Sequence, residues 1–366
     1  KANEEYLINR EPIGTVGVVW SQGNHDFYGR DDTENKVNLP WRGIVEALIR
    51  ARIPYLPVNA DHIDRDASRF KTLVLPNVGS MTKEQIASVK RFVENGGNLF
   101  ATGESSLYDE FGEPLKDFAL GDLFKAHLKN DRLKVSNKTL HTYLRLTPEI
   151  RANIYGPQTG TEPGITGERH AILKGFEQTD ILPFGGELRP LQVDANADVL
   201  MTFIPEFPIY PPETAWMREP KTDIPGLILN TLSNGSRIVY MPADIDRQFA
   251  RYNLPDHGNL LSNIIKWTLK DELPIVVSGP GLIDCSLYKQ PGRMILHLVN
   301  LTSAATWRAP LEEYIPVGPI KIKIKLEDHI QGEYPTLLVS GQRITADGWS
   351  TFQITSIANH EVVVLT

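Results

Sequence analysis

The chain has a single cysteine, Cys285, in 366 residues. One cysteine excludes an intrachain disulfide and a zinc site built from several cysteines. No basic segment stands out either. The chain has 38 Lys and Arg residues and 45 Asp and Glu residues, which gives a formal charge of −7. This balance gives no support for binding to a nucleic-acid backbone. No apolar run approaches the roughly 20 residues that a membrane-spanning helix needs, so we expect no nucleic-acid partner and no membrane partner.

The first residue is Lys1 rather than Met, and no signal peptide is recognisable in the sequence. We therefore expect that a signal or an upstream domain could have been removed, and a removed signal would imply a periplasmic or secreted protein. The residues themselves do not identify the compartment. At this length two domains are the natural expectation. We expect no cofactor.

The clearest unit is a strand, a helix and a second strand within residues 72–106. Leu73 to Leu75 form an apolar run, Thr82 and Gln85 fit a capping box at the start of the helix, and Gly96-Gly97 supply its left-handed end. Further apolar runs and helical stretches predict the same alternation at 14–21, 41–53, 55–58, 237–241 and 257–270. Alternation of this kind predicts an α/β domain, over residues 1–273, with a parallel sheet and helices on both faces.

The middle of the chain is less regular. Residues 22–38 and 147–170 have the composition of loops, and 139–146 alternate like an exposed strand. Residues 204–225 carry six prolines, so we expect them to be largely irregular. A long loop of this kind commonly covers a cleft or meets a partner. Its candidate interface or lid residues are Tyr210, Trp216 and Met217.

Short β-rich runs separated by Gly, Pro and Asp turns follow Pro274. The alternating run Ile320-Lys-Ile-Lys-Ile-Lys-Leu has one apolar face and one basic face. We interpret the basic face as a solvated surface or as edge-strand protection. Residues 274–366 are therefore predicted to form a small all-β sandwich.

The end of the strand at 98–102 is where an open α/β sheet places its ligands and its chemistry. The residues that follow are Glu104, Ser105 and Ser106, and the cysteine lies far away in sequence. Glu104 with Asp109 and Glu110 could supply the two carboxylates that glycoside hydrolysis needs. Ser105 could be a nucleophile, although the second glycine of the Gly-x-Ser-x-Gly elbow is missing. The alternative is that these carboxylates cap a turn or face water, and that no residue here is catalytic.

Other strand ends supply candidates for the lining of a cleft: Trp20, Asn24, Asn77, Gly79, Asp244, Asp246 and Arg247. An ion pair that fixes the loop is the favoured role for the last three. His25 with Asp26, and His62 with its acidic neighbours Asp61 and Asp64, lack a second histidine at a supporting spacing, so we expect no metal.

The run Gly96-Gly-Asn-Leu-Phe-Ala-Thr-Gly-Glu resembles the class I glutamine amidotransferase-like domains, which are flavodoxin-like and carry a cysteine nucleophile at this turn. Here Glu104 or Ser105 fills that position, which implies that amidotransferase chemistry is absent. The stretches Leu75-Pro-Asn-Val-Gly-Ser-Met-Thr, Phe92-Val-Glu-Asn-Gly-Gly and Asp117-Phe-Ala-Leu-Gly-Asp-Leu-Phe are similar to the trimerisation domain of family 42 β-galactosidases. Arg237-Ile-Val-Tyr-Met-Pro-Ala-Asp-Ile and His297-Leu-Val-Asn-Leu-Thr extend this likeness into the C-terminal β domain.

That resemblance implies a homo-oligomer, a trimer, and an N-terminal catalytic barrel that this chain does not contain. The first hypothesis is a non-catalytic module of a carbohydrate-active, glycoside hydrolase-like protein that serves oligomerisation and shapes a cleft. The second is an autonomous hydrolase that uses Glu104 or Ser105. The third is a carbohydrate-binding module in the C-terminal domain, which would need an exposed aromatic strip drawn from Trp307, Tyr314, Tyr334 and Trp349.

Overall fold

A computed structural model describes residues 3–129, 132–148, 168–302, 313–327, 330–346 and 351–366. The chain forms two compact units. The α/β unit comprises residues 17–46 and 57–271, and the β-rich unit comprises residues 1–16, 47–56 and 272–366. The β-rich unit therefore includes two N-terminal segments that the sequence assigns to the first domain. The boundary at 273/274 stays a prediction.

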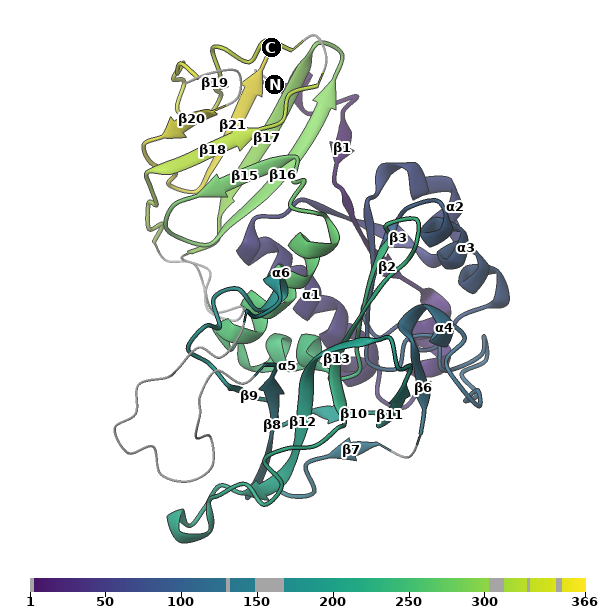
Figure 1. The fold of residues 1–366 in the computed structure, drawn as a ribbon. Helices are drawn as coiled ribbons and strands as arrows, with labels where there is room; N and C mark the ends of the chain where they lie inside the picture. The colour runs from purple at the N-terminus through teal and green to yellow at the C-terminus, as the bar shows by residue number, and fades with distance from the viewer. Residues whose placement is uncertain (1–2, 130–131, 149–167, 303–312, 328–329, 347–350) are drawn as a thin grey trace. The chain divides into compact units, whose positions relative to one another are not determined.

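Within the described residues a nine-stranded sheet has the order β3-β2-β4-β5-β14-β13-β12-β8-β9 (Figure 1). Strand β5 is parallel to both β4 and β14, and the strands from β14 to β9 are antiparallel to their neighbours. The sheet is thus mixed rather than parallel, because β13 and β14 are joined by a short turn instead of a helical crossover. The strands are β2 (Val16–Trp20), β3 (Tyr55–Asn59), β4 (Thr72–Leu75), β5 (Asn98–Thr102), β8 (Leu140–Leu146), β9 (Ile181–Pro183), β12 (Asp198–Pro208), β13 (Pro225–Thr231) and β14 (Arg237–Met241).

Two helices pack on β5, one from each side of the sheet (Figure 1). Helix α3 (Lys83–Glu94) begins with the predicted capping box of Thr82 and Gln85, and Gly96 has a positive φ of 93° at its end. Helix α6 (Pro255–Thr268) also contacts β14. The remaining helices are α1 (Leu39–Ala51), α2 (Ile63–Asp66), α4 (Gly121–Phe124) and α5 (Ile245–Tyr252), with 3-10 turns η1 (Glu4–Tyr6), η4 (Ala60–His62), η5 (Ala67–Arg69), η6 (Ala171–Leu173) and η7 (Pro212–Thr214).

The segment predicted as a polar loop at 22–38 is largely helical. It contains two π-helical turns, η2 (Asn24–Tyr28) and η3 (Glu34–Asn38). The polar side chains that favoured a loop instead satisfy backbone carbonyls within the segment: Thr33 Oγ1 donates to Gly29 O and Lys36 Nζ donates to Tyr28 O. Polarity here reflects local hydrogen bonding rather than an extended, solvated chain.

The prediction that residues 139–146 form an exposed strand is wrong. Strand β8 lies between β12 and β9, and Leu144 and Leu146 are fully buried. The proline-rich stretch 204–225 is largely irregular, as predicted, since residues 209–224 contain only the short turn η7. Strand β12 nevertheless continues into this stretch as far as Pro208, because it pairs with β8 up to Leu140. Pro205 is tolerated because the ladder is interrupted between Ile204 and Phe207, and Pro208 is the last residue of the strand. Most of the predicted loop at 147–170 lies outside the described residues.

In the β-rich unit, a five-stranded antiparallel sheet has the order β1-β16-β17-β21-β19, and a three-stranded one has the order β15-β18-β20, counted over the described residues. Both sheets contribute to one hydrophobic core that includes Ile283, Leu296, Ile322, Phe352 and Val363. The strands are β1 (Glu11–Ile13), β15 (Ile275–Ser278), β16 (Ile283–Gln290), β17 (Arg293–Asn300), β18 (Ile320–Ile324), β19 (Thr336–Leu337), β20 (Thr351–Ile354) and β21 (His360–Leu365).

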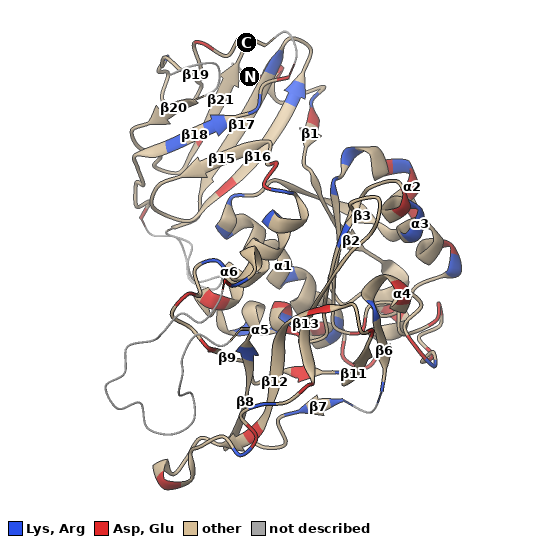
Figure 2. Ribbon diagram, viewed as in Figure 1, with Lys and Arg blue, Asp and Glu red and all other residues tan. Residues whose placement is uncertain are grey.

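The alternation in β18 is confirmed. Ile320, Ile322 and Ile324 are buried, whereas Lys321 and Lys323 are exposed and form basic positions along the strand in Figure 2. The predicted solvated face is therefore present. Among the described helices, none is both long enough and apolar enough to cross a bilayer.

Candidate functional site

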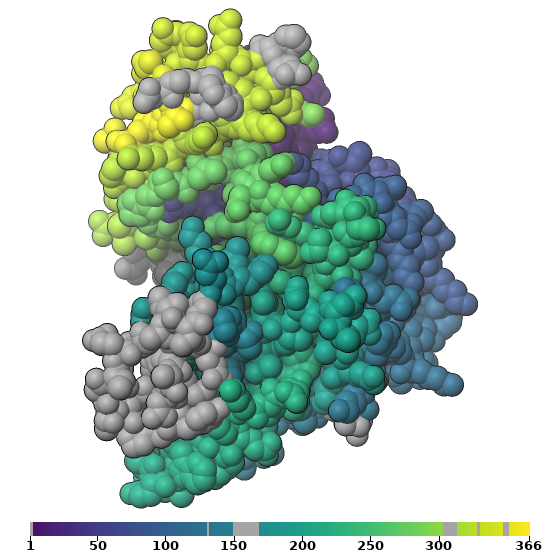
Figure 3. All heavy atoms as spheres, viewed as in Figure 1, coloured from purple at the N-terminus to yellow at the C-terminus, as the bar shows by residue number. Residues whose placement is uncertain are grey.

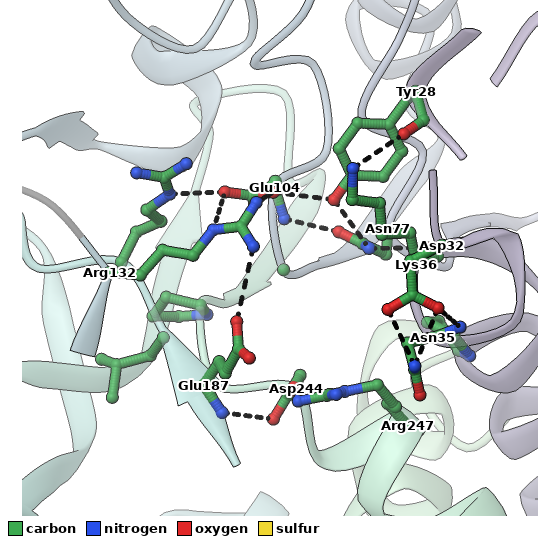
Figure 4. Close-up of a pocket in the computed structure, with 15 residues that line it drawn as sticks. Tyr28, Asp32, Asn35, Lys36, Asn77, Glu104, Arg132, Glu187, Asp244 and Arg247 are labelled. Atoms are coloured by element: carbon green, nitrogen blue, oxygen red, sulfur yellow. Dashed lines mark hydrogen bonds and ion pairs between the residues drawn. The ribbon is translucent and has the colours of Figure 1, made fainter. Parts of the chain in front are cut away.

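A polar pocket lies at the carboxyl ends of three adjacent strands of the α/β unit (Figure 4). The register sets this convergence, because Leu75 pairs with Ala101 and Met241 pairs with Thr102 across parallel neighbours. Residues that follow β4, β5 and β14 by a few positions consequently meet at one edge of the sheet. The pocket has a volume of about 90 Å³ and is lined by Tyr28, Asp32, Asn35, Lys36, Pro40, Asn77, Gly103, Glu104, Arg132, Glu187, Leu188, Arg189, Pro242, Asp244 and Arg247.

Glu104 is the centre of the hydrogen-bond network on one side of this pocket. Its side chain accepts hydrogen bonds from Arg132 Nε at 2.9 Å and from Tyr28 Oη at 2.7 Å, and it also pairs with Arg132 Nη2 and Arg189 Nε. Tyr108 Oη donates at 3.3 Å. Both carboxylate oxygens are therefore engaged, and the residue is only 7% exposed.

The arginines determine the charge state of Glu104. Burial alone would raise the pKa of its carboxyl, but the charges of Arg132 and Arg189, helped by the Tyr28 hydrogen bond, lower that pKa below its ordinary value. A carboxyl group with a lowered pKa is ionised at neutral pH and cannot donate a proton as a general acid. Its engaged oxygens are also poorly available for nucleophilic attack.

A short two-stranded ladder brings the two arginines to Glu104. Strand β7 (Leu133–Lys134) pairs with β10 (Glu187–Leu188), so Arg132 lies beside the Glu187–Arg189 segment. Arg132 Nη1 donates to Glu187 Oε2 at 3.4 Å. A second ladder, of β6 (Ala126–Leu128) with β11 (Leu191–Val193), continues the same pair of segments. These contacts join residues more than fifty positions apart in sequence.

The turn after β5 needs glycine at Gly103, which has a φ of 59°. A Cβ there would lie 2.4 Å from Asn77 Oδ1. That oxygen accepts the backbone N–H of Glu104, while Asn77 Nδ2 donates to Tyr28 Oη and to Lys36 O. Asn77 therefore links the loops that follow β4 and β5 to the 24–38 segment.

Asp244 and Arg247 form the predicted ion pair at the end of β14. Arg247 Nε donates to Asp244 Oδ2 at 2.6 Å, and the backbone N–H of Glu187 donates to Asp244 Oδ1. Burial raises the pKa of Asp244 to about 7, and Arg247 opposes this effect. The pair therefore fixes the loop and also forms part of the pocket wall.

The structure places Asn77, Glu104, Asp244 and Arg247 in the pocket, as expected for strand-end residues. Asp246 is fully buried beneath it and accepts a hydrogen bond from Thr102 Oγ1. Three further cleft candidates do not line the pocket. Asn24 Oδ1 accepts a hydrogen bond from Ser80 N, Gly79 leaves space for the Tyr28 ring, and Trp20 packs edge-on against Trp41.

The other catalytic candidates lie apart from the pocket. Ser105 is fully buried, and its Oγ donates to the carbonyl oxygens of Leu75 and Thr102 and accepts from Val78 N. Within the part of the chain that the structure describes, no histidine or carboxylate bonds to that hydroxyl. Asp109 accepts the backbone N–H groups of Phe111 and Glu113 and caps the turn that also holds Glu110.

The histidines and acidic residues that were considered as metal ligands mostly make other contacts. His25 bonds to Asp26, Asp61 accepts from Gln85 Nε2, and Asp64 pairs with Arg91. Across the described ranges, no three His, Cys, Asp or Glu residues are grouped so that they could hold a metal ion.

Sequence reasoning missed Tyr28, Lys36, Arg132, Glu187 and Arg189. The first two fall in the segment interpreted as a loop. The last two flank the buried Leu188 at a spacing of two, which places both on one face of a short strand and was the available signal. Arg132 carries no local signal, since only the ladder between β7 and β10 brings it to Glu104.

The structure describes two of the four aromatic residues that a carbohydrate-binding module in the C-terminal domain would use. Tyr314 and Tyr334 are each 52% exposed, and Arg343 lies over the Tyr334 ring. Trp307 and Trp349 fall outside the described residues.

No family model matches the sequence, and no curated protein is similar to it at a significant level. Solved structures do share its fold. An α-L-fucosidase isoenzyme 2 from Paenibacillus thiaminolyticus is similar with a TM-score of 0.67 at 16% identity, over 100% of this chain and 50% of the enzyme. A β-galactosidase from Bacillus circulans sp. alkalophilus has a TM-score of 0.62 at 13% identity, over 99% of this chain and 43% of the enzyme.

A β-galactosidase from Rahnella sp. R3 has a TM-score of 0.59 at 14% identity, over 98% of this chain and 42% of the enzyme. The chain thus spans half or less of the length of each of these enzymes. At these identities the likeness is one of fold. The chain has the fold of a part of glycoside hydrolases.

Proposed function

We propose that this chain is a non-catalytic C-terminal region of a carbohydrate-active, glycoside hydrolase-like protein. It serves oligomerisation and shapes a cleft beside a catalytic barrel carried elsewhere in the parent protein. The enzymes that share its fold are named as a fucosidase and β-galactosidases, and the chain matches only part of each. The parent protein accordingly acts on a galactoside, a fucoside or a related sugar.

The observation that carries this proposal is the state of Glu104. A retaining or inverting glycosidase needs one carboxyl with a raised pKa and a second one free to attack or to activate water. Glu104 has a lowered pKa, and its oxygens already accept hydrogen bonds from Arg132, Arg189 and Tyr28. The pocket carboxyl with a raised pKa, that of Asp244, has its oxygens bound by Arg247 and by the backbone N–H of Glu187. The strand-end position is filled by a structural ion cluster instead of a reactive group.

The finer architecture belongs to the same proposal. An amidotransferase-like, flavodoxin-like arrangement of the α/β unit is supported by the parallel strands β4, β5 and β14 with helices α3 and α6 on β5. A β-sandwich in the β-rich unit is supported by the shared core of its two sheets. Ser105 does not replace the cysteine nucleophile of amidotransferases, because its hydroxyl is bonded to backbone carbonyls.

We assign oligomerisation to the segment between β12 and β13, which forms a protrusion at the lower end of the view in Figure 3. It exposes apolar side chains at Ile209 (46%), Tyr210 (73%) and Trp216 (56%). The Arg218 guanidinium lies 3.5 Å from the centre of the Trp216 ring, which gives the indole a fixed orientation. Exposed aromatic residues held in place are typical of interface cores.

The test of non-catalysis is an assay of the purified chain with nitrophenyl β-D-galactoside and nitrophenyl α-L-fucoside. We expect no release of nitrophenol above the blank. Turnover that disappears in Glu104→Gln but persists in Glu94→Gln, a control on an exposed residue, would show an autonomous hydrolase and reject the proposal.

The test of oligomerisation is light scattering. We expect a mass about three times the 41.0 kDa of the chain. The double variant Tyr210→Ala, Trp216→Ala should shift the mass to that of the monomer, whereas Tyr252→Ala, which removes an equally exposed aromatic residue elsewhere, should not. A monomeric wild-type chain would contradict the oligomeric role, and an unchanged mass in the double variant would move the interface to another surface.

A further inference from the structure

The pocket keeps unused hydrogen-bonding groups of both kinds. In the described part of the chain, Nη1 of Arg189 and Nη1 of Arg247 have no hydrogen-bond partner. Arg189 uses Nε for Glu104 and Nη2 for the Tyr108 hydroxyl, whereas Arg247 uses Nε and Nη2 for Asp244. Glu187 uses Oε2 for Arg132 and leaves Oε1 without a partner among the same residues. Two donors and one strong acceptor are therefore available for a ligand.

These groups face a common space. Figure 4 shows Glu104, Arg132 and Glu187 on one side of the pocket and Asp32, Asn35 and Lys36 on the opposite side. Lys36 uses one donor on Tyr28 O and retains two others, by the chemistry of an ammonium group. A ligand that enters would meet donors and acceptors on both sides.

The charges of the lining are balanced. Basic and acidic side chains occur in equal number: Lys36, Arg132, Arg189 and Arg247 against Asp32, Glu104, Glu187 and Asp244. Each arginine already pairs with a carboxylate. An added anion would therefore meet acceptor oxygens as well as donors, and the pocket offers it little net attraction. A hydroxyl group suits this lining better, because it donates to a carboxylate and accepts from a guanidinium at once.

The size limits the ligand. A cavity of about 150 Å³ holds one benzene ring, whereas this pocket has about 90 Å³. It can enclose one edge of a sugar ring, with two or three hydroxyls, but not a disaccharide. The ring of Tyr28 is covered by Tyr108 at 4.8 Å and by Lys36 at 5.0 Å, so recognition would come from hydrogen bonds rather than from stacking.

We propose that the strand-end pocket between Glu187, Arg189, Arg247 and Lys36 binds the hydroxyl-bearing edge of one neutral sugar unit without cleaving it. This inference rests on the proposed function, in which the chain belongs to a carbohydrate-active protein. The ligand is a free monosaccharide or the terminal unit of a glycan, and both present the same vicinal hydroxyls. The site adds a non-catalytic sugar-binding position at the edge of the mixed sheet.

The test is saturation-transfer difference NMR with the whole chain and a panel of probes. The panel contains D-galactose, D-glucose and L-fucose, their methyl glycosides, the disaccharide lactose, and malonate as a small anion. We expect saturation of the protons along one ring edge for at least one sugar, with a dissociation constant on the order of 1 mM. A signal from a methyl glycoside and from the terminal unit of lactose assigns the site to chain ends, and a signal from the free sugar alone assigns it to monosaccharides.

Two variants locate the binding. Glu187→Gln removes the negative charge from an acceptor whose side chain is 33% exposed, and Lys36→Met removes a donor from the other side. Each should weaken binding about fivefold, the value of one hydrogen bond. Glu94→Gln, a change at an exposed residue of α3 outside the lining, should bind as wild type does. Circular dichroism verifies that each variant is folded. If one variant is unfolded, the other is sufficient to locate the binding.

Several results would overturn the inference. No saturation of any sugar would do so, as would binding of malonate in preference to every sugar. Binding that is unchanged in the folded variants would place the ligand elsewhere. These outcomes are independent of the hydrolysis and light-scattering tests, so a chain that is inactive and oligomeric but binds no sugar loses only this inference. Cleavage of a bound glycoside would instead reject the proposed function.

Discussion

The two units use buried polar side chains in different ways. In the β-rich unit such residues satisfy the backbone: Arg52 donates to the carbonyl oxygens of residues 277, 279, 280 and 281, and Asn300 Nδ2 donates to three further carbonyls. Glu361 accepts the N–H groups of Val339, Ser340 and Val362. Each of these three side chains therefore holds several backbone groups together by hydrogen bonds.

In the α/β unit the buried charges of the pocket pair with one another, and some of their atoms face open space. Glu104 engages Arg132 and Arg189, while Glu187 Oε1 stays without a partner in the described residues. In the three residues of the β-rich unit the fold uses the hydrogen-bonding groups, whereas the pocket residues retain some of theirs for the ligand that we propose.

The largest expected effect is in Glu104→Ala. Among the described residues, this change leaves Arg189 without a carboxylate and Arg132 with only its contact to the Glu187 carboxylate. Removing one partner of a buried pair costs about 3–5 kcal/mol. Urea unfolding at pH 7 should show this loss, with the Glu94→Gln control unchanged. A loss no greater than that of the control would mean that Glu104 is not the centre of the cluster.

The next largest effect is expected for Arg52→Met, which removes the hydrogen bonds from Arg52 to four backbone carbonyls of the β-rich unit. Hydrogen bonds from a charged donor contribute about 1.5–3 kcal/mol, and the carbonyls left behind lose their partner. Unfolding followed by a probe in the β-rich unit should show the loss, while sugar binding at the pocket should not change. A change in binding would contradict the separation of the two roles.

A smaller effect is the pH dependence that Glu104 confers. Because its pKa is lower in the folded chain than in the unfolded chain, its stabilising contribution is complete above the unfolded pKa of about 4.3. That contribution is lost as the pH falls through the lowered folded value. The stability gap between wild type and Glu104→Gln should therefore be wide at pH 6 and narrow as the pH falls below about 4. A gap that is constant with pH would show that Glu104 is not charged in the folded state.

The smallest effect is expected in Lys321→Ala with Lys323→Ala. Both side chains are on the exposed face of β18, and substitutions at such sites change stability little. Thermal unfolding should give a midpoint indistinguishable from wild type. A clear destabilisation would show that this basic face takes part in the fold.

Much of the local structure follows from the sequence alone. The capping box at Thr82, the glycine end of α3 and the alternation in β18 are set by neighbours a few residues apart, so the residues themselves specify them. The position of Glu104 at a strand end follows in the same way, from the apolar run of β5 and the Gly103 turn.

The partners of Glu104 were decided by the tertiary structure. Arg132 and Arg189 reach it through the ladder of β7 and β10, whose pairing is not predictable from two-residue strands. Tyr28 reaches it from a helical segment whose polarity is typical of a loop. Likewise, the direction of β13 and the burial of β8 depend on pairing between distant segments. A sequence specifies which groups are available, whereas long-range pairing determines which charges meet and which keep an atom free for a ligand.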